Sequence, residues 1–506
     1  MFAGLSPLSA EWIENWSDSV RNAAIIISIL LPIIGGFLLM QKRRITEKGR
    51  RIWCEVIACL TTALVWWILP GGCVEEFTIY SFTRGFRITL GVDGPAMLFA
   101  GMVSFMWPFV TLYAYEYMER AEHKNSFFGF YIMTYGVTLG VAFAGNVLTM
   151  YVFYEMLSLV TIPLVVHYQD HESMYAGRKY AAYVIGGAAL AFIPVVVVTL
   201  YEEAGFVWGG HSFDVLGQNY MLLLWLFGFF GFGIKAAVLP FHLWLPEATV
   251  APTPVTALLH AVAVVNSGVF AVTRLTWYVF SPEHLDGSWA QVTALTAASA
   301  TLLYAAARAL RERHFKRRLA YSTVSNLSYM LFGILLMTPS GLQAGLAHML
   351  FHGIIKMSLF LCAGAFIHQS GKHYLYEING AGRKMPLTFF FYTLGALSLT
   401  GIPLFAGFIS KWKLLTAGAE AGTMPAYIGT ACLIGAAFFC AVYTLTVSVR
   451  AFFPVEGTNW WEDTDLSDPG WRMLLPITLF SVFNVAFGVF PGPVMGFLDQ
   501  VSRGVM

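Results

Sequence analysis

Long apolar segments alternate with short polar ones along most of the chain. Runs of about 20 residues, the length of helix that crosses a ~30 Å bilayer core, recur between residues 22 and 491. Helices satisfy their backbone hydrogen bonds internally, which a membrane requires. The pattern therefore predicts an all-α polytopic membrane protein with about 14 transmembrane helices. The expected spans are 22–40, 52–70, 94–115, 127–144, 147–167, 179–200, 219–240, 254–279, 290–308, 319–337, 342–368, 387–415, 426–450 and 472–491.

One polar stretch has a different periodicity. Residues 75–90 (EEFTIYSFTRGFRITL) partly alternate between apolar and polar side chains and include Gly85. Such alternation around a glycine is typical of two strands joined by a turn. We therefore expect an extramembrane hairpin between the second and third spans.

Composition agrees with a membrane protein and excludes several other classes. The 506 residues are 57% hydrophobic and 12% charged, whereas soluble domains carry ~25% charged residues. The net charge of +1 gives no reason to expect a nucleic-acid partner. The six cysteines form no CxxC pair, and there is no phosphate-binding glycine loop or dinucleotide fingerprint. We therefore expect no cofactor and no metal in this chain.

Lysine and arginine are distributed unevenly over the polar segments. Six lie in 41–51 and six in 308–318, and 21 of the 30 fall on one side of a fourteen-span topology. The few on the other side are Arg21, Arg84, Arg87 and Arg503. The positive-inside rule assigns the richer side to the cytoplasm. We expect a multi-pass protein of the inner (cytoplasmic) membrane with both termini on the non-cytoplasmic side. The N-terminus, through Asp18, is too polar for a cleavable signal peptide, so the first apolar run is expected to be retained.

Two lysines interrupt the apolar spans. Lys235 and Lys411 end similar patterns, Gly-Phe-Gly-Ile-Lys and Gly-Phe-Ile-Ser-Lys. A lysine near mid-membrane costs at least ~2.5–3.5 kcal/mol on insertion scales, so both are functional candidates. A structural ion pair is the alternative for either residue, and Lys411 could instead snorkel toward the interface.

The two lysines indicate an internal repeat. They lie five spans apart, and an odd number reverses the direction of the helix, as in an inverted repeat. We expect one five-helix unit in 126–280 and its inverted copy in 281–452. The first three helices and the hairpin occupy 1–125, and a loop and the last helix occupy 453–506.

Both lysine-bearing spans also contain helix-breaking residues. Pro240 follows Lys235, and Gly401-Ile402-Pro403 precedes Lys411. A proline within a span frees a carbonyl, and broken helices are tolerated in membranes where they line a cavity. We therefore expect the two spans to be discontinuous.

A third group of titratable residues lies on one span. His348, His352 and Lys356 are spaced i, i+4 and i+8. Each step of four turns a helix by ~400°, so the three drift by only ~80° while they climb ~12 Å. Histidine titrates near neutrality and a buried lysine readily loses its proton. The stripe therefore predicts a proton relay across part of the membrane.

Other interpretations of these polar residues stay open. His348 and His352 have the spacing of metal ligands, although no carboxylate or cysteine lies nearby on that face, and they could also form helix–helix hydrogen bonds. Glu155 is either paired with a cation or a neutral hydrogen-bond donor. The sequence HYQDHE (167–172) superficially resembles a metal site but falls at a predicted loop, and we interpret it as solvated.

Several motifs together resemble a known family. FGIKAAVLPFHLWLPEATVAPTPVTALLHAVAVVNSGVFAV (232–272) resembles the antiporter-like subunits shared by respiratory complex I, Mrp-type cation/proton antiporters and membrane-bound energy-converting hydrogenases. The resemblance continues through LGVDGPAMLF, YEMLSL, FKRRLAYSTVSNLSYM, AHMLFHGIIKMSLFL and GIPLFAGFISKWKLL. It covers roughly residues 85–450.

The resemblance implies roles for individual residues. Glu155 matches a glutamate that pairs with the lysine at Lys235, and His260 matches a bridging position on the eighth helix that one branch of the family uses. His348, His352 and Lys356 match the relay of the family, and Lys411 matches the lysine of its outlet half-channel. Many relatives have a lysine where this chain has Asn266-Ser267, which puts more weight on His260.

The resemblance also implies a function. The chain is expected to be a proton- (or cation-) translocating antiporter-like subunit of a multisubunit redox-driven or Mrp-type complex. Its partners would be other membrane subunits, the lipid bilayer, and protons or sodium. Flavin, iron–sulfur or nickel–iron centres would belong to partner subunits, and whether the complex is an NADH:quinone oxidoreductase-like or a hydrogenase-like enzyme stays open. The alternative is a membrane subunit of a proton-energised inorganic-carbon uptake system.

Overall fold

The computed structural model describes residues 7–42, 45–83, 85–201, 205–211, 217–454, 461 and 465–506. Three arginines of the charge distribution, Arg43, Arg44 and Arg84, lie outside the described residues. The same holds for 455–460 and 462–464, which belong to the expected C-terminal loop.

The described chain is helical apart from one hairpin. Its α-helices are α1 (Pro7–Gln41), α2 (Glu47–Ile68), α3 (Gly94–Tyr117), α4 (Lys124–Ala142), α5 (Val147–Val165), α6 (His171–Tyr201), α7 (Gln218–Gly233), α8 (Trp244–Glu247), α9 (Thr253–Ala261), α10 (Val264–Arg274), α11 (Pro282–Leu285), α12 (Trp289–Arg311), α13 (Phe315–Leu335), α14 (Pro339–Ser370), α15 (Ala381–Lys384), α16 (Pro386–Thr400), α17 (Ala406–Glu420), α18 (Met424–Phe452), α19 (Trp471–Val489) and α20 (Gly492–Ser502). Short helices of other types are η1 (Leu69–Gly71), η2 (Ala248–Val250), the π-helix η3 (Leu275–Val279) and η4 (Leu375–Ile378).

Ten helical segments of the described residues are long and apolar enough to cross a membrane. The other four expected spans coincide with α4, α7, α13 and the pair α16–α17. Of these, α7 and α16 are only 16 and 15 residues long because each helix is interrupted. α13 instead buries several polar side chains, which lower its hydropathy. The all-α polytopic architecture is therefore confirmed, together with ten of the expected spans.

The helix breaks have defined positions. After α7, residues 234–243 form turns. Two hydrogen bonds stabilise these turns: the Trp244 indole donates to the Ile234 carbonyl at 2.8 Å, and the Leu239 N–H donates to the Thr301 hydroxyl at 3.0 Å. Residues 401–405 separate α16 from α17. A third break separates α9 from α10 at Val262 and Ala263. That break was not expected, because the sequence there contains neither proline nor glycine.

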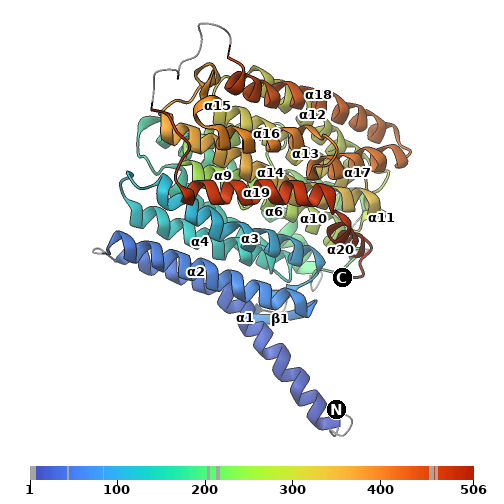
Figure 1. Ribbon diagram of the computed structural model, residues 1–506. Helices are drawn as coiled ribbons and strands as arrows, with labels where there is room; N and C mark the ends of the chain where they lie inside the picture. Colours follow the sequence, from blue (N-terminus) through green and yellow to red (C-terminus); the bar gives the residue numbers. More distant parts are fainter. Residues whose placement is uncertain are drawn as a thin grey trace.

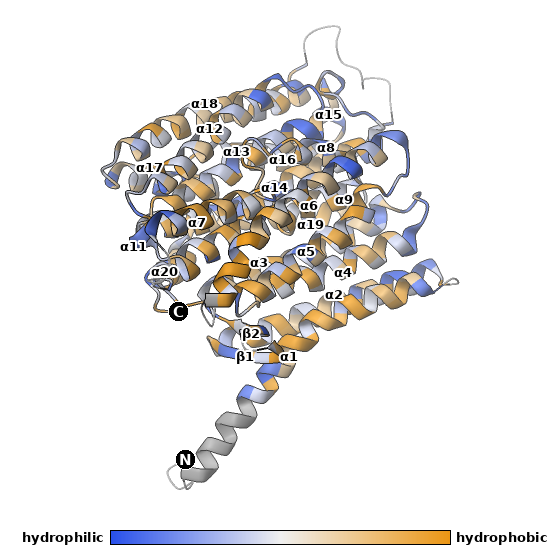
Figure 2. Cartoon of the chain, turned by 180° about the vertical axis from the view of Figure 1, so that it is seen from behind, coloured by the Kyte–Doolittle hydropathy of each residue, from blue (hydrophilic) through white to orange (hydrophobic). Residues whose placement is uncertain are grey.

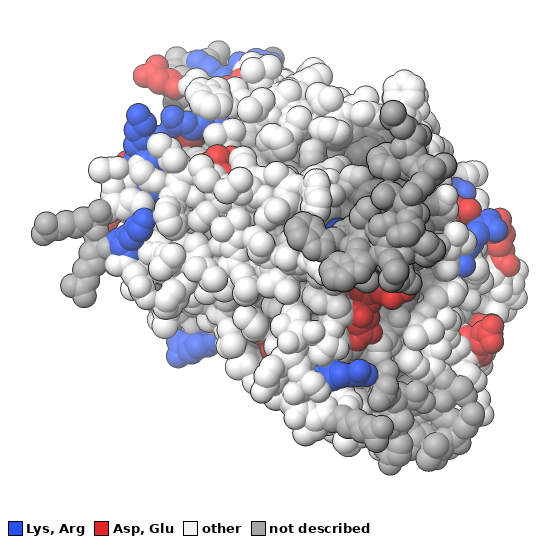
Figure 3. Space-filling view, turned by 90° about the horizontal axis from the view of Figure 1, so that it is seen from below, with Lys and Arg blue, Asp and Glu red and all other residues white. Residues whose placement is uncertain are grey.

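The helices lie side by side with their polar ends at two opposite sides. Figure 1 shows that α1 at the N-terminal end, the hairpin, α11, α20 and the C-terminus lie at one end of the bundle, whereas α15 lies at the other. Figure 2 shows hydrophobic residues along the middle of the bundle, with hydrophilic residues near α11 and α15. On the face in Figure 3, charged side chains surround a wide uncharged area. The two polar ends are those expected at the two membrane surfaces.

The helix α14 and the segment α9–η3 form the core of the bundle. The apolar window of α14 is 94% buried, and that of 253–279 is fully buried. α14 packs against α3, α9, α13, α16, α17 and α19. Polar side chains in the buried window of α14 must therefore find their partners inside the protein, because they are shielded from lipid and bulk water.

The predicted hairpin is confirmed. Strands β1 (Val74–Thr83) and β2 (Phe86–Val92) pair antiparallel, with Thr83 opposite Phe86. The Thr89 N–H donates to the Thr149 hydroxyl at 2.9 Å, and this bond ties β2 to α5. The hairpin therefore lies at the end of the bundle that also carries α11 and α20 (Figure 1).

Candidate functional site

Six of the seven candidate residues are buried inside the bundle. Each is at most 5% exposed: Lys235, His260, His348, His352, Lys356 and Lys411. Glu155 is half-buried, and its Oε1 atom is buried without a hydrogen-bond partner. The candidates come from α5, from the break after α7, and from α9, α14 and α17. The fold thus gathers groups from five separate stretches of sequence.

Lys235 is held by its neighbour on α5. Its ammonium donates to the Tyr154 carbonyl and lies over the Tyr154 ring, 3.3 Å from the centroid. The Tyr154 hydroxyl donates to the Phe232 carbonyl at 2.7 Å, which joins α5 to the last turn of α7. A carbonyl and an aromatic face stabilise a cation without a second buried charge.

Both Glu155 and Lys235 are described residues, and no ion pair forms between their side chains. Glu155 follows Tyr154 directly on α5, and the two charges still act on each other electrostatically. The structure therefore gives Lys235 a direct partner other than Glu155, and the pairing of Glu155 with Lys235 stays a prediction. The main-chain carbonyl takes the position that a carboxylate oxygen was expected to occupy.

Lys411 is held by the break in its own helix pair. Its ammonium donates to the Leu399 carbonyl at 2.5 Å and lies 5.2 Å from the centroid of the Tyr329 ring. Leu399 would bond to the N–H of residue 403 if the helix continued, but Pro403 has none. The helix ends at Gly401, whose backbone is left-handed at φ 96°, and Pro403 adds no N–H that could compete for the Leu399 carbonyl, so this acceptor is available to the lysine. Because Lys411 is buried, the snorkelling interpretation is wrong.

The two candidate histidines of α14 have different surroundings. His348 is hydrogen-bonded through Nδ1 to the Ser410 hydroxyl at 2.9 Å and through Nε2 to Asn326 Oδ1 at 3.1 Å. It therefore bridges α17 and α13. Neither ring nitrogen of His352 has a partner, and its ring centroid lies 5.8 Å from that of His348. His352 is the one with free capacity to bond water or a proton.

Lys356 extends the row toward the other end of α14. Its ammonium donates to the Leu319 carbonyl at 2.9 Å and to the Ser322 hydroxyl. Together with His348 and Lys411, it faces one side of α13, on which Leu319, Ser322, Asn326 and Tyr329 lie. Sequence reasoning missed these α13 positions. Their spacing of three and four residues in FKRRLAYSTVSNLSYM was the available signal.

His260 lies at the end of α9, beside the unexpected break. Neither of its ring nitrogens has a partner, and the ring contacts Phe360 of α14 at 5.0 Å between centroids. Next to it, the Asn266 side chain donates to the Ala261 carbonyl at 2.8 Å. Asn266 thus binds a carbonyl near the break, at a position where many relatives are expected to carry a lysine.

The histidine-rich segments do not assemble a metal site. Among the described residues, no group of three or more His, Cys, Asp or Glu side chains is arranged to hold a metal ion. Both nitrogens of His348 are used in hydrogen bonds, so the HxxxH spacing does not create a ligand pair. In the HYQDHE segment, the Ser173 N–H donates to Asp170 Oδ1 at 2.7 Å, which lowers the pKa of that carboxyl. Glu172 pairs with Arg317 at 2.9 Å at the surface.

Comparison with known proteins identifies relatives of this arrangement. The sequence profile described as "NADH:quinone oxidoreductase/Mrp antiporter, TM" matches residues 144–437. A Na(+)/H(+) antiporter subunit of Alkalihalophilus pseudofirmus is 31% identical over 94% of this chain. The chain spans 61% of the length of that relative.

Solved structures share the fold. The membrane-bound sulfane sulfur reductase, an archaeal respiratory membrane complex, contains a chain with a TM-score of 0.84 and 21% identity, covering 95% of this chain and 97% of its own. Respiratory complex I from Thermus thermophilus with bound NADH contains one with a TM-score of 0.79 and 23% identity, covering 95% and 98%. These comparisons confirm the resemblance drawn from the motifs.

Proposed function

Because this chain belongs to the NADH:quinone oxidoreductase/Mrp antiporter transmembrane family, we propose that it is a proton- (or cation-) translocating subunit of a redox-driven or Mrp-type membrane complex. One observation carries the proposal. Lys356, His352, His348 and Lys411 form a row through the buried core, and both lysines are held by main-chain carbonyls rather than by carboxylates. Buried titratable groups of this kind are costly in a membrane protein and serve ion pathways.

The proposal includes a topology of fourteen crossings. Beyond the ten long apolar helices, the continuous helices α4 and α13 would make two crossings, and the interrupted segments at α7 and α16–α17 would make two more. Lys235 and Lys411 would occupy corresponding positions of an inverted repeat. The positions of the two chain ends at the same end of the bundle support an even number of crossings (Figure 1). The protein would lie in the inner (cytoplasmic) membrane, with the 308–318 segment in the cytoplasm and both termini opposite.

The mechanism requires that each buried lysine alternate between amine and ammonium. A carbonyl accepts a hydrogen bond from either form, so the lysine stays in place when it loses its proton. In an environment of ε ≈ 20, a unit charge ~4 Å away changes the energy of the ammonium by ~4 kcal/mol. Movement of charge near Glu155 would therefore drive Lys235 from one state to the other.

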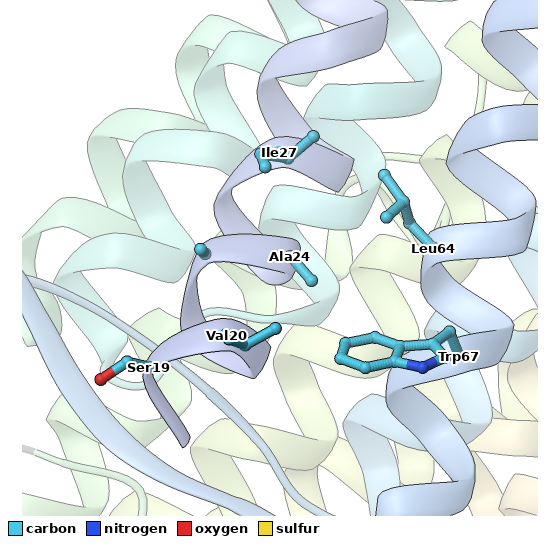
Figure 4. Close-up of a pocket in the computed structure, with 7 residues that line it drawn as sticks. Ser19, Val20, Ala24, Ile27, Leu64 and Trp67 are labelled. Carbon is cyan, nitrogen blue, oxygen red and sulfur yellow. The ribbon is translucent and has the colours of Figure 1, made fainter. Parts of the chain in front are cut away.

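We propose that coupling passes through neighbouring membrane subunits. The helices α1 and α2 expose apolar side chains, including Ile34, Phe37, Ile52 and Trp66. A groove of about 590 Å³ lies between these helices. Ile27, Leu64 and Trp67 line it (Figure 4). This surface suits lateral packing against another membrane protein of the complex. Flavin, iron–sulfur or nickel–iron centres of such a complex would reside in those partners.

Two variants of one lysine test the proposal. Lys235→Ala in the complete complex should reduce ion translocation in vesicles at least about tenfold while assembly persists, because a lone buried carboxylate can protonate. Lys235→Arg should also fail, since arginine keeps its charge at any accessible pH. Lys413→Ala is the matched control, because Lys413 is exposed. Near wild-type pumping by Lys235→Arg would show that Lys235 has a purely structural role.

A further inference from the structure

A fourth lysine shares the environment of the three already described. Lys316, in the first turn of α13, is 5% exposed, and its ammonium donates to the Ala251 carbonyl at 2.9 Å. From the sequence alone, Lys316 is only one of the basic residues that indicate the cytoplasmic side. Among the residues that the structure describes, no carboxylate oxygen lies within ion-pair distance of the Lys316 ammonium.

A comparison with other lysines of the described residues shows that this environment is distinctive. Lys124, Lys179 and Lys372 each pair with a glutamate, and their side chains are 20%, 22% and 52% exposed. Lys235, Lys356 and Lys411 are buried and bind carbonyls. Lys316 therefore belongs with the second group, by burial and by partner, despite its position at the end of a helix.

Lys316 also continues the polar face of α13. The positions 316, 319, 322, 326 and 329 fall within ~140° of the helix circumference and span ~20 Å along its axis. Leu319 and Ser322 hold Lys356, Asn326 holds His348, and Tyr329 lies beneath Lys411. Lys316 is one turn from Leu319, so it extends the row beyond Lys356 toward the basic end of the bundle.

The residue that follows Lys316 in the sequence reaches the protein surface. The side chain of Arg317 is 34% exposed and pairs with Glu172 at 2.9 Å. Around Lys316 lie charged or titratable groups from four stretches: His314 and Arg317 of its own segment, Glu172 of α6, His260 of α9 and His373 after α14. Burial and the charges of Lys316 and Arg317 lower the pKa of His314 to about 3, so that ring stays neutral at physiological pH.

We propose that Lys316 is the group through which the α13–α14 row exchanges protons with water on the basic, cytoplasmic side. This inference rests on the proposed function and extends it. The Lys316 amine takes a proton from hydronium and becomes ammonium. It then releases that proton through a bridging water to the Lys356 amine, which becomes ammonium while the Lys316 amine re-forms. No other bond changes, and the Ala251 carbonyl holds Lys316 in both states.

Two substitutions separate this role from a structural one. Lys316→Gln keeps a donor for the Ala251 carbonyl, and Lys316→Arg keeps both donor and charge, but neither carries a releasable proton. In vesicles containing the complete complex, both should lower translocation at least about tenfold with assembly retained. Wild-type rates in either variant would overturn the proposal. Arg317→Gln, adjacent but at the surface, is the matched control and should stay within about twofold of wild type.

A parallel measurement with Lys235→Ala separates the two proposals. If Lys235→Ala loses translocation and Lys316→Gln does not, only the role of Lys316 is refuted. If Lys235→Ala pumps normally, the proposed function itself is refuted.

Labelling of the unmodified complex provides a test that does not depend on variants. Cyanate carbamoylates neutral amines, and peptide mass spectrometry locates the modified lysine. In inside-out vesicles, Lys316 should be modified at neutral pH from the exposed cytoplasmic side, with the surface residue Lys372 as the reference for reagent access. Labelling of Lys372 without labelling of Lys316 would contradict water access to Lys316 and overturn the proposal, also in the case where its variants fail to assemble.

Discussion

The two broken helices bury a lysine by different means. After α7, Lys235 lies within the break, near its start, and the carbonyl that binds its ammonium comes from Tyr154 on the intact helix α5. Between α16 and α17, the break precedes Lys411 and itself supplies the Leu399 carbonyl. Each break also contains a non-glycine residue with a left-handed backbone, Ala237 at φ 55° and Leu404 at φ 76°. The similar sequence patterns thus produce two different sites.

The difference assigns different parts to the two lysines. Glu155 follows Tyr154, whose carbonyl binds the Lys235 ammonium. The proton affinity of Lys235 therefore responds to a charge on Glu155. Among the described residues, no carboxylate forms an ion pair with Lys411, and its sequence neighbour Ser410 is hydrogen-bonded to His348. The first site is suited to respond to a signal, and the second to pass a proton along a row. We expect their variants to fail in different ways.

The largest expected effect is the loss of Lys411. Lys411→Ala should lower translocation by more than about tenfold, because it removes the last titratable group of the row. Purified complex should contain the variant chain in the normal amount. Wild-type proton flux in vesicles would show that the row does not continue through α17.

Loss of the Glu155 charge comes next. Glu155→Gln should reduce translocation roughly tenfold, since a unit charge several ångströms from Lys235 is worth ~2–4 kcal/mol at ε ≈ 20. Glu420→Gln, at the exposed end of α17, is the matched control. An effect equal to that of the control would remove the proposed distinction between the two lysines.

A smaller effect should follow from restoring the N–H at residue 403. In Pro403→Ala, this donor would compete with Lys411 for the Leu399 carbonyl, at a cost of ~1 kcal/mol or about fivefold in rate. Pro476→Ala, within α19, tests proline removal away from the lysine. Equal rates in both variants would indicate that the freed carbonyl is unimportant.

The smallest effect is expected at Cys440, whose thiol also contacts the Leu399 carbonyl at 3.4 Å. Thiols are weak donors, so Cys440→Ala should change translocation less than about twofold. A stopped-flow measurement of proton flux resolves such a change. A tenfold loss would mean that the thiol shares control of Lys411.

Much of the fold follows from the one-dimensional pattern. The apolar runs predict the long helices, the alternating stretch predicts the β1–β2 hairpin, and Pro240 and Pro403 predict two of the breaks. The break at Val262 escaped prediction because no proline or glycine marks it. At this break the Asn266 side chain binds the Ala261 carbonyl, and an asparagine at this position is no local signature of a helix break.

The amino-acid sequence alone is enough to identify the residues that are unusual inside a membrane: Lys235, Lys411, and the stripe of His348, His352 and Lys356. Transfer cost and helical periodicity are local properties, so these candidates can be found without coordinates. Their partners follow from the three-dimensional packing, because hydrogen bonds such as Lys235 to Tyr154 and Lys316 to Ala251 join residues 81 and 65 positions apart. Packing likewise buries Lys316, whereas the arginines of the same segment, 308–318, stay exposed or partly exposed. Burial of one side chain depends on every element that covers it.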